Sequence, residues 1–181
     1  EEIESRKLSI LEASGSYTYV KKANGREFKA IKGMGLGQGN EVITGKDSKI
    51  YIEADNDKVI RLDEDTIVEI SKASAKSLGL KLHSGNLFFN VDKPLGSDED
   101  MTFAAAHASM SIRGTSGVFS FNPLKMEFFL VEGSVEWDLG DGNIIDIKAG
   151  ETIEMENDYL KAVFWPENGG RLYSLFDKVS G

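Results

Sequence analysis

Apolar and polar residues alternate with a period of two along most of the chain, as in residues 49–54, 78–83 and 135–139. Because successive side chains of a β-strand point to opposite faces, each such run has one apolar face to bury. Gly, Asn and Asp gather between the runs, for example at Asn24-Gly25 and Asp141-Gly142. These pairs suit tight turns because Gly tolerates a positive φ. The pattern predicts an all-β fold.

Short strands about every 8–12 residues, separated by glycine-rich turns, are typical of an antiparallel β-sandwich, a jelly-roll-like fold or a short β-roll. One segment has helical spacing instead, with apolar residues at Leu172, Leu175, Phe176 and Val179. It predicts a short C-terminal helix that packs on the sheet. We therefore expect a β domain over residues 1–156 and a C-terminal extension over residues 157–181.

Gly33, Gly35, Gly37 and Gly39 recur at every second position, so one face of this segment carries no side chain. We interpret the segment as a close backbone approach or as a bend that enters the main sheet.

The composition narrows the class of protein further. Charged residues make up 28% of the chain and hydrophobic ones 40%, with a formal net charge of -9. No run approaches the roughly 20 apolar residues that a membrane helix needs. So acidic a chain, without a basic patch, is repelled by phosphate backbones, and we expect no nucleic-acid partner.

The chain has no cysteine, which excludes disulfides, thiolate metal sites and cysteine nucleophiles. It begins at Glu1 and not at Met. We interpret this as a cut or processed form, and the sequence leaves open whether a signal peptide or membrane anchor lay upstream.

The common templates of catalysis and of metal binding do not fit. Neither the phosphate-loop motif nor the dinucleotide motif is matched at the glycines. Only His83 and His107 are available as bases, and no nucleophile elbow is present. Carboxylates cluster near Asp55, Asp63 and Asp98, but no cluster fits the EF-hand loop. We interpret them as solvated turns, with calcium binding left open, and expect no catalytic residue, cofactor or metal site.

Six motifs follow one another in a specific order. They are GNEVITG at residues 39–45, DTIVEI at 65–70, LHSGNLFFNV at 82–91, SIRGTSGVF at 111–119, VEGSV at 131–135 and AGE at 149–151. Over residues 14–156 this succession resembles the FecR domain family.

The resemblance implies a non-enzymatic, β-rich domain outside the cytoplasmic membrane. The best-known members are anti-sigma regulators, whose outer domain relays a signal from a receptor through one membrane helix. The implied partner is an envelope protein. The implied location is the periplasm or the cell surface, with a tether supplied by a segment that this sequence does not contain.

We interpret the residues of these motifs as fold-defining and not as catalytic. Gly114 is expected to allow a turn or bulge between two strands, Gly133 and Gly150 to allow tight reversals, and Thr115 to bond to nearby backbone. The full set is Thr44, Gly45, Gly85, Arg113, Gly114, Thr115, Gly133 and Gly150.

The candidate binding surface consists of tyrosines. Tyr17 and Tyr19 alternate onto one strand face, and Tyr51 is the third member. Phe88, Phe119 and Phe129 stand opposite the apolar faces of their strands and either face a second layer, which we favour, or form a patch.

The leading hypothesis is a sensing or protein-interaction module of the cell envelope. The alternative is a module that binds carbohydrate or the cell wall through surface aromatics. Its candidate residues are Trp165 with Tyr159, or Tyr51 with Asp55.

Overall fold

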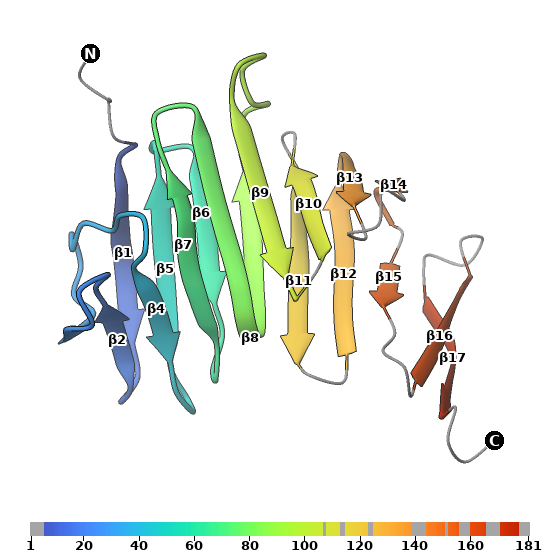
Figure 1. The fold of residues 1–181 in the computed structure, drawn as a ribbon, viewed down its shortest axis with the longest axis horizontal. Coiled ribbons are helices and arrows are strands. Elements are labelled where there is room, and N and C mark those ends of the chain that lie inside the picture. Colours follow the sequence, from blue (N-terminus) through green and yellow to red (C-terminus); the bar gives the residue numbers. More distant parts are fainter. Residues whose placement is uncertain are drawn as a thin grey trace.

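The computed structural model describes residues 6–106, 108–112, 115–122, 125–138, 144–150, 152–155, 160–165 and 171–177, with the backbone alone from residue 152 onward. All elements in this part of the chain are strands (Figure 1). They are β1 (Leu8–Ser14), β2 (Thr18–Lys21), β3 (Glu27–Lys29), β4 (Glu41–Thr44), β5 (Lys49–Ala54), β6 (Lys58–Leu62), β7 (Ile67–Ala73), β8 (Ser77–Val91), β9 (Asp100–Ala105), β10 (Ala108–Ile112), β11 (Ser116–Asn122), β12 (Lys125–Glu132), β13 (Ser134–Asp138), β14 (Ile144–Lys148), β15 (Thr152–Met155), β16 (Leu160–Trp165) and β17 (Arg171–Asp177).

The 15-residue strand β8 organises the sheet. Its residues 77–84 pair with β7 and β9, and its residues 85–91 pair with β6 and β11. The first set of strands continues through β4, β2 and β3 on one side and through β10, β13 and β14 on the other. The second set continues through β5 and β1, and through β12 and β15. We call these two sets the first and second halves of the sheet.

The two halves face each other across one core. Phe89 of the second half contacts Phe103 of the first, with ring centroids 4.7 Å apart. Phe128 and Trp137 meet in the same way at 6.0 Å. All four rings are buried, and in Figure 1 the strands of one half run over those of the other. Each half therefore has an inner face in the core and an outer face, which we call the first and second outer faces.

The all-β class is confirmed. β1 to β15 form one large mixed sheet, and β16 and β17 form a separate two-stranded sheet. The pairing is therefore not purely antiparallel as predicted, and the finer class of sandwich, jelly roll or short roll stays a prediction. The parallel pair is β8 with β9, in which Ser77 lies opposite Asp100. Alternation records which side of a strand is buried but not the direction of its neighbour, so the sequence pattern did not reveal this pair.

The predicted C-terminal helix is wrong. Residues 171–177 form β17, which pairs antiparallel with β16. A register shift between Val163 and Phe164 interrupts the alternation in this hairpin. A short apolar run is ambiguous between helix and strand, and here a neighbouring strand decided the outcome.

The segment with alternating glycines lies along β1. Ile10 N–H donates to Met34 O at 2.9 Å, and Leu36 N–H donates to Leu8 O at 2.8 Å. The predicted close backbone approach is therefore present. The glycines are not required by a lack of space, because a Cβ at Gly35 or Gly37 would meet nothing within 4 Å.

β8 reverses its buried side where it passes from one half to the other. Its buried leucines occupy even positions from Leu78 to Leu82, and its buried residues occupy odd positions from Leu87 to Val91. Gly85 lies at the reversal with φ 92°. A Cβ at this position would lie 2.6 Å from Thr66 Cα and 2.7 Å from the Asp65 carbonyl oxygen. Only glycine has both the backbone freedom and the small size that this bend requires.

We expect Gly85→Ala to lower the free energy of unfolding by about 2–5 kcal/mol, since it adds backbone strain and a clash with backbone atoms. Gly33→Ala is the matched control, because Gly33 also has a positive φ of 82° but open space around it. It should cost only the conformational term of about 1–2 kcal/mol. Urea denaturation measures the free energy of unfolding of both variants. Equal losses in the two variants would contradict the clash with Thr66 as a cause of destabilisation at Gly85.

Candidate functional site

Two motif threonines hold the turns beside the bend of β8. Thr44 Oγ1 accepts a hydrogen bond from Thr66 N–H at 3.0 Å and donates to the carbonyl of Asp63. Thr66 Oγ1 accepts from Asn86 N–H at 3.0 Å. Both threonines are buried, so each hydroxyl satisfies main-chain groups that water cannot reach. This network joins β4, the turn between β6 and β7, and the middle of β8.

The remaining motif residues have different surroundings. Gly133 lies between β12 and β13 with φ 88°, and Gly150 has φ 86°. Arg113 and Gly114 lie outside the described residues. Thr115 is buried, and its Oγ1 has no hydrogen-bond partner among the residues that the structure describes. The expected local bond from Thr115 is therefore not found there.

Two of the three predicted surface tyrosines lie together on the first outer face. The rings of Tyr17 and Tyr19 are 4.7 Å apart, and Tyr17 is 46% exposed. Tyr19 pairs across the strands with Ile43, which pairs in turn with Ile67. These side chains are half-buried, and with Tyr17 they form what we call the tyrosine surface (Tyr17, Tyr19, Ile43 and Ile67).

The motif glycine Gly45 supports this surface. Its N–H donates to Tyr17 O at 2.9 Å. A side chain at this position would meet Tyr17 Cβ at 2.9 Å. The turn at Thr44 and Gly45 therefore holds the neighbouring strands through Thr44 and positions Tyr17 through Gly45.

Tyr51 lies on the second outer face, apart from the other two tyrosines. It pairs across the strands with Arg61, which pairs with Phe88. The Arg61 guanidinium lies 3.7 Å from the centre of the Phe88 ring, a cation–π contact. Asp55, the predicted companion of Tyr51, follows the far end of β5 and pairs with Arg6.

The three phenylalanines divide between the two sides of the second half. Phe119 lies on the buried face of β11 at 1% exposure, so it faces the core and neither stands opposite that face nor forms a surface patch. Phe88 is half-buried on the second outer face, and Phe129 is 38% exposed. Phe129 and Phe88 pair with the two sides of Val118. Of the other aromatic candidates, Tyr159 lies outside the described residues, and only the backbone of Trp165 is described.

A polar hollow of about 650 Å³ opens at the turn end of the second outer face. Its side chains come from the last outward positions of neighbouring strands and from two turns. They are Ser14, Lys49 and Asn86 from the strands, and Asp47, Asp63 and Glu64 from the turns. The Glu64 carboxylate accepts a hydrogen bond from Asp47 N–H at 2.9 Å, which joins the two turns.

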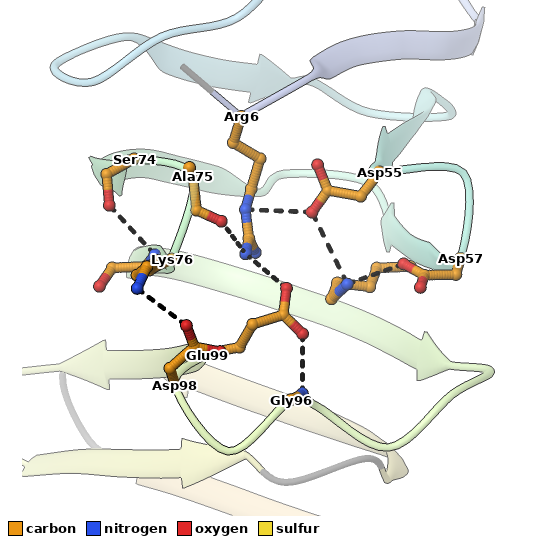
Figure 2. A network of polar contacts seen from close by, with 11 residues as sticks. Arg6, Asp55, Asp57, Ser74, Ala75, Lys76, Gly96, Asp98 and Glu99 are labelled. Carbon is orange, nitrogen blue, oxygen red and sulfur yellow. Dashed lines mark hydrogen bonds and ion pairs between the residues drawn. The ribbon is translucent and has the colours of Figure 1, made fainter. Parts of the chain in front are cut away.

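Arg6 organises the opposite end of the sheet (Figure 2). Its side chain is fully buried; Nε faces Asp55 Oδ2 at 3.0 Å as an ion pair and not as an aligned hydrogen bond. Nη2 contacts Glu99 Oε1 at 3.2 Å and donates to Ala75 O at 3.1 Å. Lys58, also buried, lies 3.6 Å from the same carboxylate of Asp55. These contacts join the start of β1 to three loops.

The acidic turns at this end are therefore not merely solvated, as the sequence suggested. Asp55 and Glu99 balance the charge of Arg6, and Lys76 lies 2.8 Å from Asp98. In the described part of the chain, no group of three or more His, Asp or Glu side chains is placed to hold a metal ion.

His83 is paired with Glu69 at 2.9 Å on the first outer face, and His107 lies outside the described residues. The described residues include no helix that is long and apolar enough to cross a membrane.

Sequence reasoning missed two features of these sites, the hollow and the Arg6 network. The hollow is built from residues of four separate segments, which no local motif brings together. Arg6 precedes the first strand as one basic residue among several, and its burial depends on partners 49 and 93 positions away.

Comparison with known proteins identifies the family of the chain. A model of the FecR protein family matches residues 40–136, more than half of the chain, so the resemblance read from the motifs is confirmed. No curated protein matches the chain. Two crystal structures of a putative anti-sigma factor from Parabacteroides distasonis ATCC 8503 share the fold, each with a TM-score of 0.58 and 14% identity. The match covers 76% of this chain and 59% of that one, so this chain spans less than two thirds of its length.

We expect Thr44→Val to lower the free energy of unfolding by about 1–3 kcal/mol, because it leaves the buried Thr66 N–H without its acceptor. Thr115→Val is the control of equal shape, and it should change stability by less than about 0.5 kcal/mol, since no described group bonds to its hydroxyl. Thermal and urea unfolding test both variants. A larger loss in Thr115→Val than in Thr44→Val would contradict this assignment.

The exposed pair of Lys76 and Asp98 predicts a measurable titration. The hydrogen bond and charge of Lys76 hold the pKa of Asp98 below 3.8, and Asp98 likewise raises the pKa of Lys76 above 10.5. The lowered pKa stabilises the fold above pH 3.8, and this contribution is lost as the pH falls through the folded value. The raised pKa stabilises the fold below pH 10.5, and that contribution is lost as the pH rises through the folded value.

NMR titration of the Asp98 carboxyl tests this pair. In Lys76→Ala the pKa of Asp98 should return toward 3.8. Lys72→Ala, which removes the partner of Asp100, should leave it unchanged. An unchanged Asp98 titration in Lys76→Ala would contradict the pairing.

Proposed function

The chain belongs to the FecR protein family, and from this premise we propose that it is a non-enzymatic sensing and protein-interaction domain of the cell envelope. It acts outside the cytoplasmic membrane, in the periplasm or at the cell surface, as part of a signalling protein of the anti-sigma regulator type. A segment beyond this sequence tethers it. The family match over residues 40–136 carries this proposal.

We infer a domain that binds and does not catalyse. The sequence matches none of the catalytic templates considered, and the one described histidine, His83, is held by Glu69 on an exposed sheet face. The resemblance to the FecR family implies a regulatory role. We also propose that residues 1–156 form the FecR-like domain and that residues 157–181 form an extension to it.

The tyrosine surface is the site that we propose for an envelope protein partner. Its rings combine an apolar body with a hydroxyl, a combination enriched in protein interfaces. Tyr17 and Tyr19 contact each other, and two half-buried isoleucines extend the apolar area beside them.

The charged row beside this surface gives it a polar rim. Lys21 and Glu41 pair at 3.0 Å, and Glu69 pairs with His83. An apolar centre with a polar rim is the usual organisation of a protein interface. The turn that holds Gly45 and Thr44 fixes one end of the surface, so little ordering is needed when a partner binds.

A cross-linking pull-down from solubilised envelope protein tests the proposal, with the 181-residue chain as bait. The double variant Tyr17→Ala/Tyr19→Ala should weaken capture of a saturable partner by about tenfold or more, as expected for aromatic hot spots. Tyr51→Ala, on the second outer face, is the matched control and should bind the partner as well as the unchanged chain.

Melting temperatures should remain similar in all of these variants, because the altered rings lie outside the core. A partner retained equally by all variants would place the interface elsewhere. No saturable protein partner in the envelope fraction would overturn the proposed function itself.

A further inference from the structure

The polar hollow combines several kinds of hydrogen-bonding group in a small space. It presents the carboxylates of Asp47, Asp63 and Glu64, the amide of Asn86 and the ammonium of Lys49. Carboxylates accept, ammonium groups donate, and amides do both. At about 650 Å³ the hollow lies within the range of roughly 300–1,000 Å³ typical of small-molecule sites. A ligand rich in hydroxyls, which donate and accept, matches such a lining.

The charge of the lining narrows the ligand class. Three carboxylates stand against one ammonium, and the nearby Arg61 lies 3.4 Å from Asp63 and is already paired with it. The whole chain is also acidic, with a net charge of -9. Phosphates, sulfates and acidic sugars would be repelled at this site. The lining therefore disfavours an anionic ligand.

Tyr51 is not part of the lining, but it occupies the next outward position along β5 after the lining residue Lys49. Tyr51 is two residues from Lys49 on β5, and outward side chains at this spacing lie about 7 Å apart along a strand. Arg61 and Phe88 occupy the corresponding positions on β6 and β8, since they lie two residues from Asp63 and Asn86, respectively. The guanidinium of Arg61 lies over the Phe88 ring, so Tyr51 is the ring left to stack on a ligand.

We propose that this hollow binds a neutral oligosaccharide. The sugar hydroxyls exchange hydrogen bonds with Asp47, Glu64 and Asn86, and one sugar ring stacks on Tyr51. Polar groups for the hydroxyls beside an aromatic ring for the apolar sugar face are the two elements that a carbohydrate needs from a protein.

The turns that form the hollow are fixed before any ligand arrives. The Glu64 carboxylate holds Asp47 N–H, and Ser48 Oγ accepts from Tyr17 N–H at 3.1 Å. A Cβ at Gly15 would lie 2.5 Å from the Asp47 carbonyl oxygen, so glycine is needed for the approach of these two turns. A preformed site binds with less loss of conformational entropy than a mobile one.

The ring proposed to stack on the sugar and the rings of the proposed protein interface lie on different outer faces. Tyr51 belongs to the second outer face and Tyr19 to the first, so one variant of each kind separates the two proposals. A failure of the glycan experiment would therefore not count against the proposed protein interface, and a failure of the pull-down would not count against the glycan site.

NMR titration of the ¹⁵N-labelled chain with cellotetraose tests the proposal at millimolar concentrations of sugar. We expect saturable shifts of the backbone amides of Asp47, Lys49 and Asn86. Tyr51→Ala should weaken binding by about tenfold, the loss expected for one aromatic stacking contact. Tyr19→Ala, a tyrosine of similar burial on the other face, should bind as the unchanged chain does.

Two further measurements make the outcome decisive. Tyr51→Leu keeps apolar bulk without a flat ring and should weaken binding as Tyr51→Ala does, which keeps the test valid if the alanine variant folds poorly. A heparin-derived tetrasaccharide, which is strongly anionic, should cause no shifts at the hollow. The assignment would be overturned if cellotetraose caused no shifts or caused shifts only elsewhere. It would also be overturned if both Tyr51 variants bound the sugar unchanged, or if the anionic sugar bound more tightly.

Discussion

The bend of β8 at Gly85 is the constraint on which the rest of the structure depends. One strand serves both halves of the sheet, so its buried side must change from even to odd positions within a few residues. The change is possible because Gly85 adopts φ 92° and leaves room for Thr66. Thr66 and Thr44 then satisfy the main-chain groups that the bend exposes inside the protein. Without this local solution the two inner faces would not meet across a common core.

The bend also explains why the candidate sites gather at one end of the molecule. The turns that hold Thr44 and Thr66 are the same turns that carry Gly45, Asp47 and Glu64. The tyrosine surface lies on one side of these turns, and the polar hollow lies on the other. The Tyr17 N–H that binds Ser48 joins the two sites directly. A rigid set of turns thus presents two chemically different surfaces.

At the opposite end of the sheet, ion pairs of Arg6 and Lys58 hold the loops together, whereas threonine hydroxyls do so near Gly85. Burial of the Arg6 guanidinium is costly, and Asp55 and Glu99 offset that cost only while both stay in contact with it. Asp55 lies in the loop after β5, and Glu99 lies in the loop that connects the parallel strands β8 and β9. The ion pairs therefore hold the residue before β1 against both loops. Lys58 shares Asp55 with Arg6, which makes the cluster one coupled network (Figure 2).

Much of this protein could be read from its sequence, because the relevant signals are local. Alternation in segments such as 49–54 specified strands, and the order of the glycine and threonine motifs specified the FecR family. The contact between Tyr17 and Tyr19 also followed from spacing, since residues two apart share a strand face.

The tertiary structure decided the rest. The parallel pairing of β8 and β9, the strand at residues 171–177 and the placement of Tyr51 away from Tyr19 all depend on which strand lies alongside. The burial of Arg6 and the lining of the hollow depend on residues distant in the chain. Periodicity records that a side chain is buried, but not which distant group it is buried against, because that choice is made only when the whole sheet closes on its core.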